Sequence, residues 1–138
     1  MSIANGKFEI QLSVRANDID ELNHVSNIVY LRWVQDVAVA HWQAVASAES
    51  QNAIVWVVLR HEIDYKAPAV IGDEIVARTW VGEISGITFE RHTEILRRAN
   101  KQLLARARTV WCPVNKETGR PTRVGTEIRT QFSSYTLG

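Results

Sequence analysis

The chain has 138 residues, and its 46% apolar and 22% charged residues are an ordinary composition for a globular protein. This length fits one domain, so we expect residues 1–138 to form a single folded domain and not a disordered chain. The 16 Lys and Arg residues nearly balance the 15 Asp and Glu residues. The resulting net charge of +1 argues against a protein whose main work is binding nucleic-acid phosphates.

The single cysteine and the N-terminal residues bear on where the protein works. Cys112 alone can form neither an intramolecular disulfide nor a zinc site built on thiolates. The N-terminal residues lack the basic start and apolar run of a secretion signal, and the apolar stretch near residue 54 is too short to span a bilayer. We therefore expect a cytoplasmic protein with no membrane span.

The first predicted elements are a strand and a long helix. Apolar and polar residues alternate over 8–15, which is the period of a half-buried strand, and the polar stretch 17–23 ends it. Over 27–47, apolar residues recur at steps of three and four, which predicts a helix of about 20 residues, or roughly 30 Å. Its apolar positions cover well over half of the circumference, so we expect other elements to surround it.

The rest of the chain predicts four long strands and a short terminal helix. The strands are expected at 53–65, 74–81, 87–98 and 103–114, with a turn at 82–86 and the helix at 124–132. A single sheet buries such a long helix only by curling around it, which favours an α+β domain with a curved antiparallel sheet. The uncovered face and edges of this sheet favour self-association.

The segment between the first strand and the long helix, NDIDELNHVSN at 17–27, is dense in reactive side chains. The start of a helix offers unpaired backbone N–H groups, which stabilise a carbonyl oxygen as it becomes anionic. A nearby carboxylate can attack an acyl carbon or take a proton from water. The same residue types also suit an ordinary loop and helix cap, so a purely structural role stays open.

Three strings carry a family resemblance: DIDELNHVSNIVYLRW, HEIDYKAPAVIGDEI and NKETGRPTRV. They resemble the hot-dog fold acyl-CoA thioesterases, the group that contains 4-hydroxybenzoyl-CoA thioesterase, and the first is also similar to the signature of the plant acyl-carrier-protein thioesterases. The resemblance covers most of the chain. It implies a hot-dog fold, an α+β domain in which a curved antiparallel sheet of about five strands wraps a long central helix.

The resemblance also implies a site and a reaction. Asp20 matches the family's catalytic carboxylate and would act as nucleophile or general base in thioester hydrolysis, and His24 would orient the carbonyl or tune Asp20. The backbone N–H groups of Val25, Ser26 and Asn27 would polarise or position the carbonyl. No cofactor and no metal are expected. The implied partners are an acyl-CoA or acyl-carrier-protein thioester and further copies of the chain, in a homodimer or homotetramer with the site between subunits.

Two other functions fit the same fold. A non-catalytic module would bind acyl thioesters without turnover, and a hot-dog dehydratase or hydratase would pair His24 with Asp36 in the long helix. The chain also departs from the family pattern at two positions. Ser26 stands where Asn is usual, and Asn23 is displaced by one position.

Three side-chain groups outside the loop have two interpretations each. One basic group suits either the phosphates of coenzyme A or solvated strand ends: Arg97, Arg98, Lys101, Arg106 and Arg108. A second group has the residue types of metal ligands: His61, Glu62, Asp64 and His92. Neighbouring residues of a strand point to opposite faces, so a surface strand is the favoured interpretation there. The five tryptophans either line an aromatic acyl pocket or fill the core, which is favoured.

Overall fold

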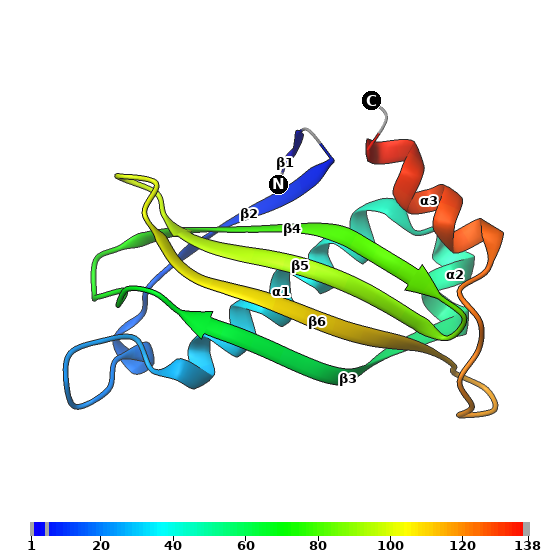
Figure 1. Ribbon diagram of the computed structural model, residues 1–138, viewed down its shortest axis with the longest axis horizontal. Coiled ribbons are helices and arrows are strands. Elements are labelled where there is room, and N and C mark those ends of the chain that lie inside the picture. The colour runs from blue at the N-terminus through cyan, green and yellow to red at the C-terminus, as the bar shows by residue number, and fades with distance from the viewer. Residues whose placement is uncertain (1, 5, 137–138) are drawn as a thin grey trace.

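The computed structural model describes residues 2–4 and 6–136, with side chains from 6 to 133. Its elements are β1 (Ser2–Ala4), β2 (Lys7–Ser13), a 3-10 turn (Ala16–Asp18), α1 (Asn27–Val45), α2 (Ala48–Ala53), β3 (Ile54–Tyr65), β4 (Glu74–Ser85), β5 (Thr88–Arg97), β6 (Leu103–Asn115) and α3 (Thr126–Thr136) (Figure 1). Among these described helices, none is long and apolar enough to cross a membrane.

The strands form one antiparallel sheet in the order β1-β2-β4-β5-β6-β3. Five of its six strands are the long strands expected from the sequence, and the sixth is the three-residue β1, which pairs with β2 at one edge. β3 forms the opposite edge, because its only strand partner in the described chain is β6. One side of β3 therefore presents backbone groups without a strand partner.

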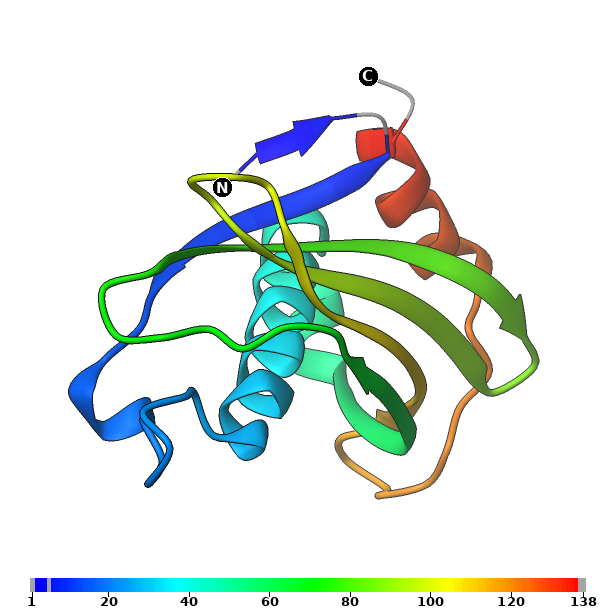
Figure 2. The ribbon, with the colours of Figure 1, turned by 60° about the vertical axis from the view of Figure 1, so that its left-hand side comes forward.

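The sheet curls around α1, which runs along its concave face (Figure 2). Nine of the 19 residues of α1 are buried, as the wide apolar stripe predicted. On β5, Phe89 and Arg91 are buried on the face toward α1, and Glu90 and His92 alternate with them on the other face. The expected α+β architecture, with a curved antiparallel sheet around one long helix, is confirmed.

The two halves of α1 contribute to two separate clusters of buried side chains. The N-terminal half packs Trp33 against Phe8 and the middle of the sheet, whereas the C-terminal half packs Trp42 with Phe89 and Phe132. The loop over 14–26 lies at the left end of the sheet in Figure 1, and α3 covers the right end. The loop and the aromatic cluster are therefore at opposite ends of the same helix.

The predicted turn at 82–86 is wrong in its position. β4 continues to Ser85, and the turn follows at Gly86 and Ile87. Gly82 instead lies where the pairing of β4 with β5 is irregular, and a Cβ there would run into Oε1 of Glu90 and into Nε2 of His92 at 2.8 Å. Glycine is required here because the side chains of Glu90 and His92 lie close to the backbone of residue 82. A sequence pattern does not distinguish such a glycine from one in a turn. The short helix α2 was also not predicted.

Candidate active site

The loop before α1 folds into a small hairpin. Ile19 and Val25 form an antiparallel bridge, and the N–H of Asp20 donates to the carbonyl of His24 at 2.8 Å. A second bridge joins His24 to Val70 in the connection between β3 and β4. These backbone contacts hold Asp20 beside the residues that lead directly into α1.

Asp18, the first acid of the loop, is a buried structural residue. Its side chain is 3% exposed, and its carboxylate accepts from the N–H of Arg15 at 2.9 Å and from Nη2 of Arg32 at 3.0 Å. Burial alone would raise the pKa of Asp18, but the hydrogen bonds from Arg15 and Arg32 outweigh it and hold this pKa below its ordinary value. Asp18 therefore fastens the loop to α1 as an ion.

Asp20, the second acid, is exposed and shapes the turn of the hairpin. Its Oδ1 accepts from the N–H groups of Leu22 at 2.8 Å and His24 at 3.2 Å. Asn23 completes the turn with a positive φ of 61°, a conformation that Asn adopts more readily than most residues. In the described part of the chain, Oδ2 of Asp20 has no hydrogen-bond partner. One oxygen holds the turn, and the other is available to a substrate or to water.

The backbone N–H groups at the start of α1 are not equally available. The N–H of Val25 donates to the carbonyl of Ala69 and the N–H of Ser26 to the carbonyl of Asp18, each at 2.8 Å. Ser26 is the N-cap, but its side chain makes no capping hydrogen bond. No acceptor for the N–H of Asn27 or Ile28 lies within the described residues. Of the three N–H groups expected to polarise the carbonyl, only that of Asn27 has no acceptor within the described residues. The N–H of Ile28, which was not expected, is also without one.

Two tyrosines pack the neighbouring elements against the helix start. Tyr30 is 2% exposed, its hydroxyl accepts from the N–H of Ala69 at 2.9 Å, and burial raises its pKa. The hydroxyl of Tyr65, the last residue of β3, donates to the carbonyl of Asn27 at 3.3 Å. The helix start is thus fixed by β3 and by the connection that follows it. His24 is half-buried beside them, and its ring has no hydrogen-bond partner within the described residues.

Asp36 lies away from this loop. It is exposed on α1 nine residues after Asn27, which is about 14 Å along the helix axis. The structure therefore does not bring His24 and Asp36 together within one chain.

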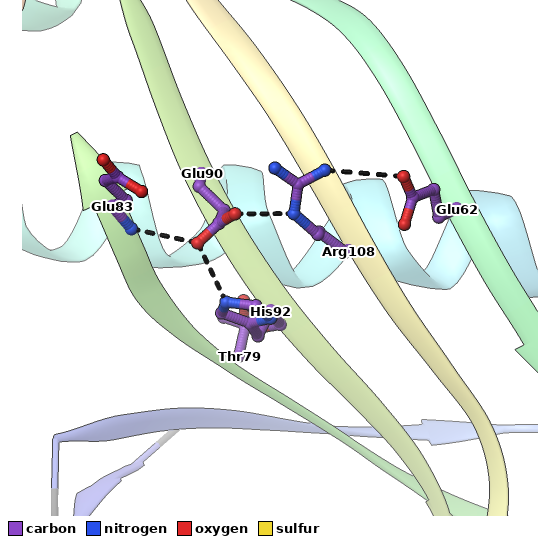
Figure 3. Close-up of polar contacts among 6 residues, drawn as sticks. All are labelled: Glu62, Thr79, Glu83, Glu90, His92 and Arg108. Atoms are coloured by element: carbon purple, nitrogen blue, oxygen red, sulfur yellow. Dashed lines mark hydrogen bonds and ion pairs between the residues drawn. The ribbon is translucent and has the colours of Figure 1, made fainter. Parts of the chain in front are cut away.

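The outer face of the sheet carries a polar network centred on Glu90 (Figure 3). Oε1 of Glu90 accepts from the N–H of Glu83 at 3.0 Å and lies 3.1 Å from Nε2 of His92, while Oε2 accepts from Nε of Arg108 at 2.5 Å. Nη1 of Arg108 also lies 3.5 Å from Oε1 of Glu62. The N–H of Glu83, together with Arg108 and His92, holds the pKa of Glu90 below its ordinary value.

The residues considered as metal ligands do not converge. His61 points to the inner face, where its Nδ1 lies 3.0 Å from Oγ1 of Thr109, and burial lowers its pKa. Glu62 and His92 are on the outer face, where Glu62 contacts Arg108, Arg108 contacts Glu90, and Glu90 contacts His92. Across the described chain, no group of His, Cys, Asp or Glu side chains is arranged to hold a metal ion.

The basic residues around the turn between β5 and β6 are partly committed to other contacts. Arg97 donates to Asp73 at 3.0 Å, to the carbonyl of Pro68 at 2.8 Å and to Gln102. Arg108 belongs to the Glu90 network, and the one ion pair of Arg106 within the described residues is a long contact of 3.8 Å with Glu94. Arg98 and Lys101 are exposed and make no ion pair within the described residues. Of the five basic residues, Arg98, Lys101 and Arg106 therefore remain the most accessible to a phosphate group.

Residues 14–132, most of the chain, match the family described as the thioesterase-like superfamily. The chain belongs to this superfamily. The family recognised in the sequence, with its hot-dog fold, is thereby confirmed.

Two thioesterases are similar to this chain over part of its length. A palmitoyl-acyl carrier protein thioesterase of Arabidopsis thaliana is 31% identical over 83 residues, which are 59% of this chain and 20% of that protein. The long-chain acyl-CoA thioesterase FadM of Escherichia coli is 26% identical over 83 residues, 56% of this chain and 61% of that protein. The chain thus spans about a fifth of the plant relative's length.

A solved thioesterase of Thermus thermophilus, complexed with coenzyme A and Zn, has the same fold. It superposes with a TM-score of 0.82 at 23% identity, over 95% of this chain and 95% of that one. At this identity the similarity establishes the architecture, with the long helix and the curved sheet in the same arrangement.

One buried group of this superfamily member was missed by the sequence analysis. Arg91 is 3% exposed and lies on the inner face of β5, with Nη1 donating to Nδ1 of His41 at 2.8 Å. The sequence did carry a signal for it. Arg91 is an even number of positions from the apolar Phe89 and Ile95, so the strand period places all three on the same buried face. An arginine at an inward position of a predicted strand therefore marks a group to examine.

Proposed function

We propose that this protein hydrolyses acyl thioesters of coenzyme A or of acyl-carrier protein. One observation carries the proposal. The same short segment holds a carboxylate oxygen without a partner, Oδ2 of Asp20, and leads into the unoccupied backbone N–H groups at the start of α1. Membership of the thioesterase-like superfamily supports the same reaction.

The N–H groups of Asn27 and Ile28 polarise the thioester carbonyl. They stand at the N-terminus of a 19-residue helix, where unpaired donors and the helix dipole both favour an oxygen that is gaining negative charge. Donors that are fixed before the substrate arrives need no reorganisation during the reaction. The hydrogen bonds of Val25 and Ser26 to the protein serve this purpose by holding the helix start in place.

Asp20 supplies the second half of the chemistry. As a nucleophile, its carboxylate attacks the acyl carbon, the carbon–sulfur bond breaks with release of the thiolate, and water then hydrolyses the mixed anhydride. As a general base, it takes a proton from a water molecule that attacks the same carbon. Both routes consume one water and yield the free acid and the free thiol. His24, in the same hairpin as Asp20, orients the carbonyl or the carboxylate.

A second copy of the chain completes the site. The unpaired edge of β3 carries three exposed apolar side chains, Val55, Val57 and Leu59, which are 44%, 43% and 55% exposed. Antiparallel pairing of two β3 edges would satisfy their backbone groups and bring these side chains beside those of the partner strand. In such a pairing about the middle of the strand, the Tyr65 end of one copy lies against the Ile54 end of the other.

The direct test is thiol release from a panel of short, long and aromatic acyl-CoAs, with wild type, Asp20→Asn and Asp36→Asn. Asparagine keeps an Oδ1 acceptor for Leu22 and His24, so the turn is preserved while the carboxylate is lost. We expect Asp20→Asn to lose at least about a hundredfold in kcat, the usual range for a general base. The exposed control Asp36→Asn should retain turnover.

The two other functions predict different outcomes. A binding module would bind an acyl-CoA with unchanged affinity in Asp20→Asn and would show no turnover even in the wild type. A dehydratase or hydratase would act on enoyl thioesters and would depend on Asp36 instead. Wild-type turnover that survives in Asp20→Asn would remove this carboxylate from the mechanism.

A further inference from the structure

A cavity lies at the end of α1 that is remote from Asp20. The space in it that a water molecule can reach is about 40 Å³, which is room for a few water molecules or for a group the size of a carboxylate. Its lining comes from α1, β3, β5, β6 and α3 and is mostly aromatic: Ala38, Val39, Trp42, Trp56, Phe89, Arg91, Trp111 and Phe132. Such walls suit a hydrocarbon chain or an aromatic ring.

The one charged residue in this lining has no counter-ion. Arg91 is 3% exposed, and no carboxylate pairs with it anywhere in the described chain. Only its Nη1 has acceptors, Nδ1 of His41 at 2.8 Å and Oγ1 of Thr79 at 3.3 Å, and both are neutral. Its guanidinium also lies 5.5 Å from the Phe132 ring and 5.7 Å from the Phe89 ring. A buried cation without an anion is costly unless a ligand supplies the anion.

Two indoles of the cavity lining have N–H donors without acceptors, and so does the ring of His41 behind Arg91. Nε1 of Trp56 and Nε1 of Trp111 are buried and have no partner among the described residues, although both indoles line the cavity. His41 accepts from Arg91 through Nδ1, so its proton is on Nε2, which is also buried without a partner. Natural proteins leave few such groups unsatisfied. The cation and the two indole N–H donors of one lining are the complement of an anionic oxygen ligand.

We propose that this cavity receives the remote end of an acyl group that has an apolar body and a terminal carboxylate, and that Arg91 binds this carboxylate. The substrate class is therefore the monothioesters of dicarboxylic acids. The end of a simple saturated acyl group would contact the aromatic walls but leave the guanidinium of Arg91 without a counter-ion. A hydroxyl would satisfy one donor but would not neutralise the charge.

This inference rests on the proposed function, and it uses the second copy of the chain. Within one chain, Ala38 lies 11 residues beyond Asn27, or about 16 Å along α1, so the cavity is remote from the start of its own helix. Trp56 lies near the beginning of β3, and Tyr65 at its end contacts Asn27. Antiparallel pairing of two β3 edges brings the cavity of one copy toward the helix start of the other. The thioester and the terminal carboxylate are then held by different subunits.

The test compares matched substrates that differ only at the remote end. Adipoyl-CoA is paired with hexanoyl-CoA and suberoyl-CoA with octanoyl-CoA, and the readout is the ratio of kcat/KM within each pair. We expect wild type to prefer the dicarboxylate by roughly tenfold or more in at least one pair, and Arg91→Met to abolish or reverse this preference. Arg78→Met, which removes an arginine paired with Glu9 on the outer face, should leave the ratio unchanged.

Folding of the variant is checked separately by thermal melting. Arg91→Met replaces a buried cation with an apolar side chain of similar length, so we expect it to melt at or above the wild-type temperature. Arg91→Gln serves as a second variant, because it keeps hydrogen-bond donors but not the charge. Equal kcat/KM for both members of each pair in wild type, or a preference that survives in Arg91→Met, would overturn the proposal.

A binding measurement separates this proposal from the thioesterase proposal. Three tryptophans line the cavity, so free suberate should change the intrinsic fluorescence of wild type, and octanoate should do so more weakly. If wild type hydrolyses no thioester, the proposed function fails, and the titration still decides the subsite. A suberate response that is lost in Arg91→Met would support it, and no response in wild type would overturn it.

Discussion

Nη1 of Arg91 donates to Nδ1 of His41 over 2.8 Å on the inner face of the sheet, a hydrogen bond that only a neutral imidazole can accept. His41 is 1% exposed and stacks on Phe8, with ring centroids 4.8 Å apart. Burial, with a smaller contribution from the charge of Arg91, lowers the pKa of His41 from 6.5 to about 3. The folded protein therefore resists protonation at this ring, whereas the unfolded chain does not.

The first prediction is a loss of stability in weak acid. Below the unfolded pKa of 6.5, the unfolded chain binds a proton at His41 that the folded protein does not bind until about pH 3. The free energy of unfolding should therefore fall as the pH drops through this window, by about 2 kcal/mol between pH 7 and pH 5 from this one group. Urea unfolding at the two pH values measures the change.

The matched variant for this prediction is His41→Asn, whose side-chain oxygen can still accept from Arg91. Its free energy of unfolding should depend on pH less steeply than that of wild type in the same window. The remaining histidines are unchanged in this comparison, so the difference isolates His41. Parallel pH profiles for the two proteins would show that the ring does not carry the effect.

The second prediction concerns Asp18, which fastens the loop over 14–26 to α1. Asp18→Asn replaces a buried ion that Arg15 and Arg32 stabilise, and it leaves an amide N–H facing donors. We expect a loss of about 1–3 kcal/mol in the free energy of unfolding, the usual cost when a buried hydrogen-bonded group loses its match. Urea unfolding at neutral pH measures it. Asp36→Asn, at an exposed position, should change stability by less than about 0.5 kcal/mol.

The contrast between Asp18 and Asp20 shows how far the sequence could predict the site. The strand and helix periods gave α1 and the long strands because those signals are local. The family resemblance singled out Asp20, but the burial of Asp18 depends on Arg32, which is fourteen residues away. Likewise, the occupied N–H of Val25 depends on Ala69 in the connection after β3. Contacts between segments that are distant in the sequence decide which carboxylates and N–H groups are free to bind a substrate. Such contacts cannot be predicted from a local sequence pattern.

The third prediction concerns Gly82, which the sequence suggested was in a turn. Gly82→Ala puts a Cβ against the carboxylate of Glu90 and the ring of His92, so Glu90 must give up some of its hydrogen bonds. We expect a loss of about 1–3 kcal/mol in the free energy of unfolding, the usual cost of inserting a methyl group into a packed site. Gly125→Ala is the control, because no atom lies within 4 Å of its added Cβ.

A double-mutant cycle identifies the cause of this loss. In a Glu90→Ala background, the carboxylate that blocks the new methyl group is gone, so Gly82→Ala should cost clearly less than in wild type. Equal costs in the two backgrounds would assign the effect to the strand backbone instead of to the network around Glu90.

The fourth prediction concerns the edge of β3. Val57→Lys combined with Leu59→Lys places two charges on the exposed face of β3, where they would repel the same charges on a paired second copy. We expect wild type to have the mass of two or more chains by light scattering and the double variant to have the mass of one. Because the proposed site needs both copies, thioesterase activity should fall with the mass. Ile87→Lys is the control, since Ile87 is also exposed, at 42%, but lies in the turn between β4 and β5. A double variant that keeps both the wild-type mass and activity would place the interface elsewhere on the molecule.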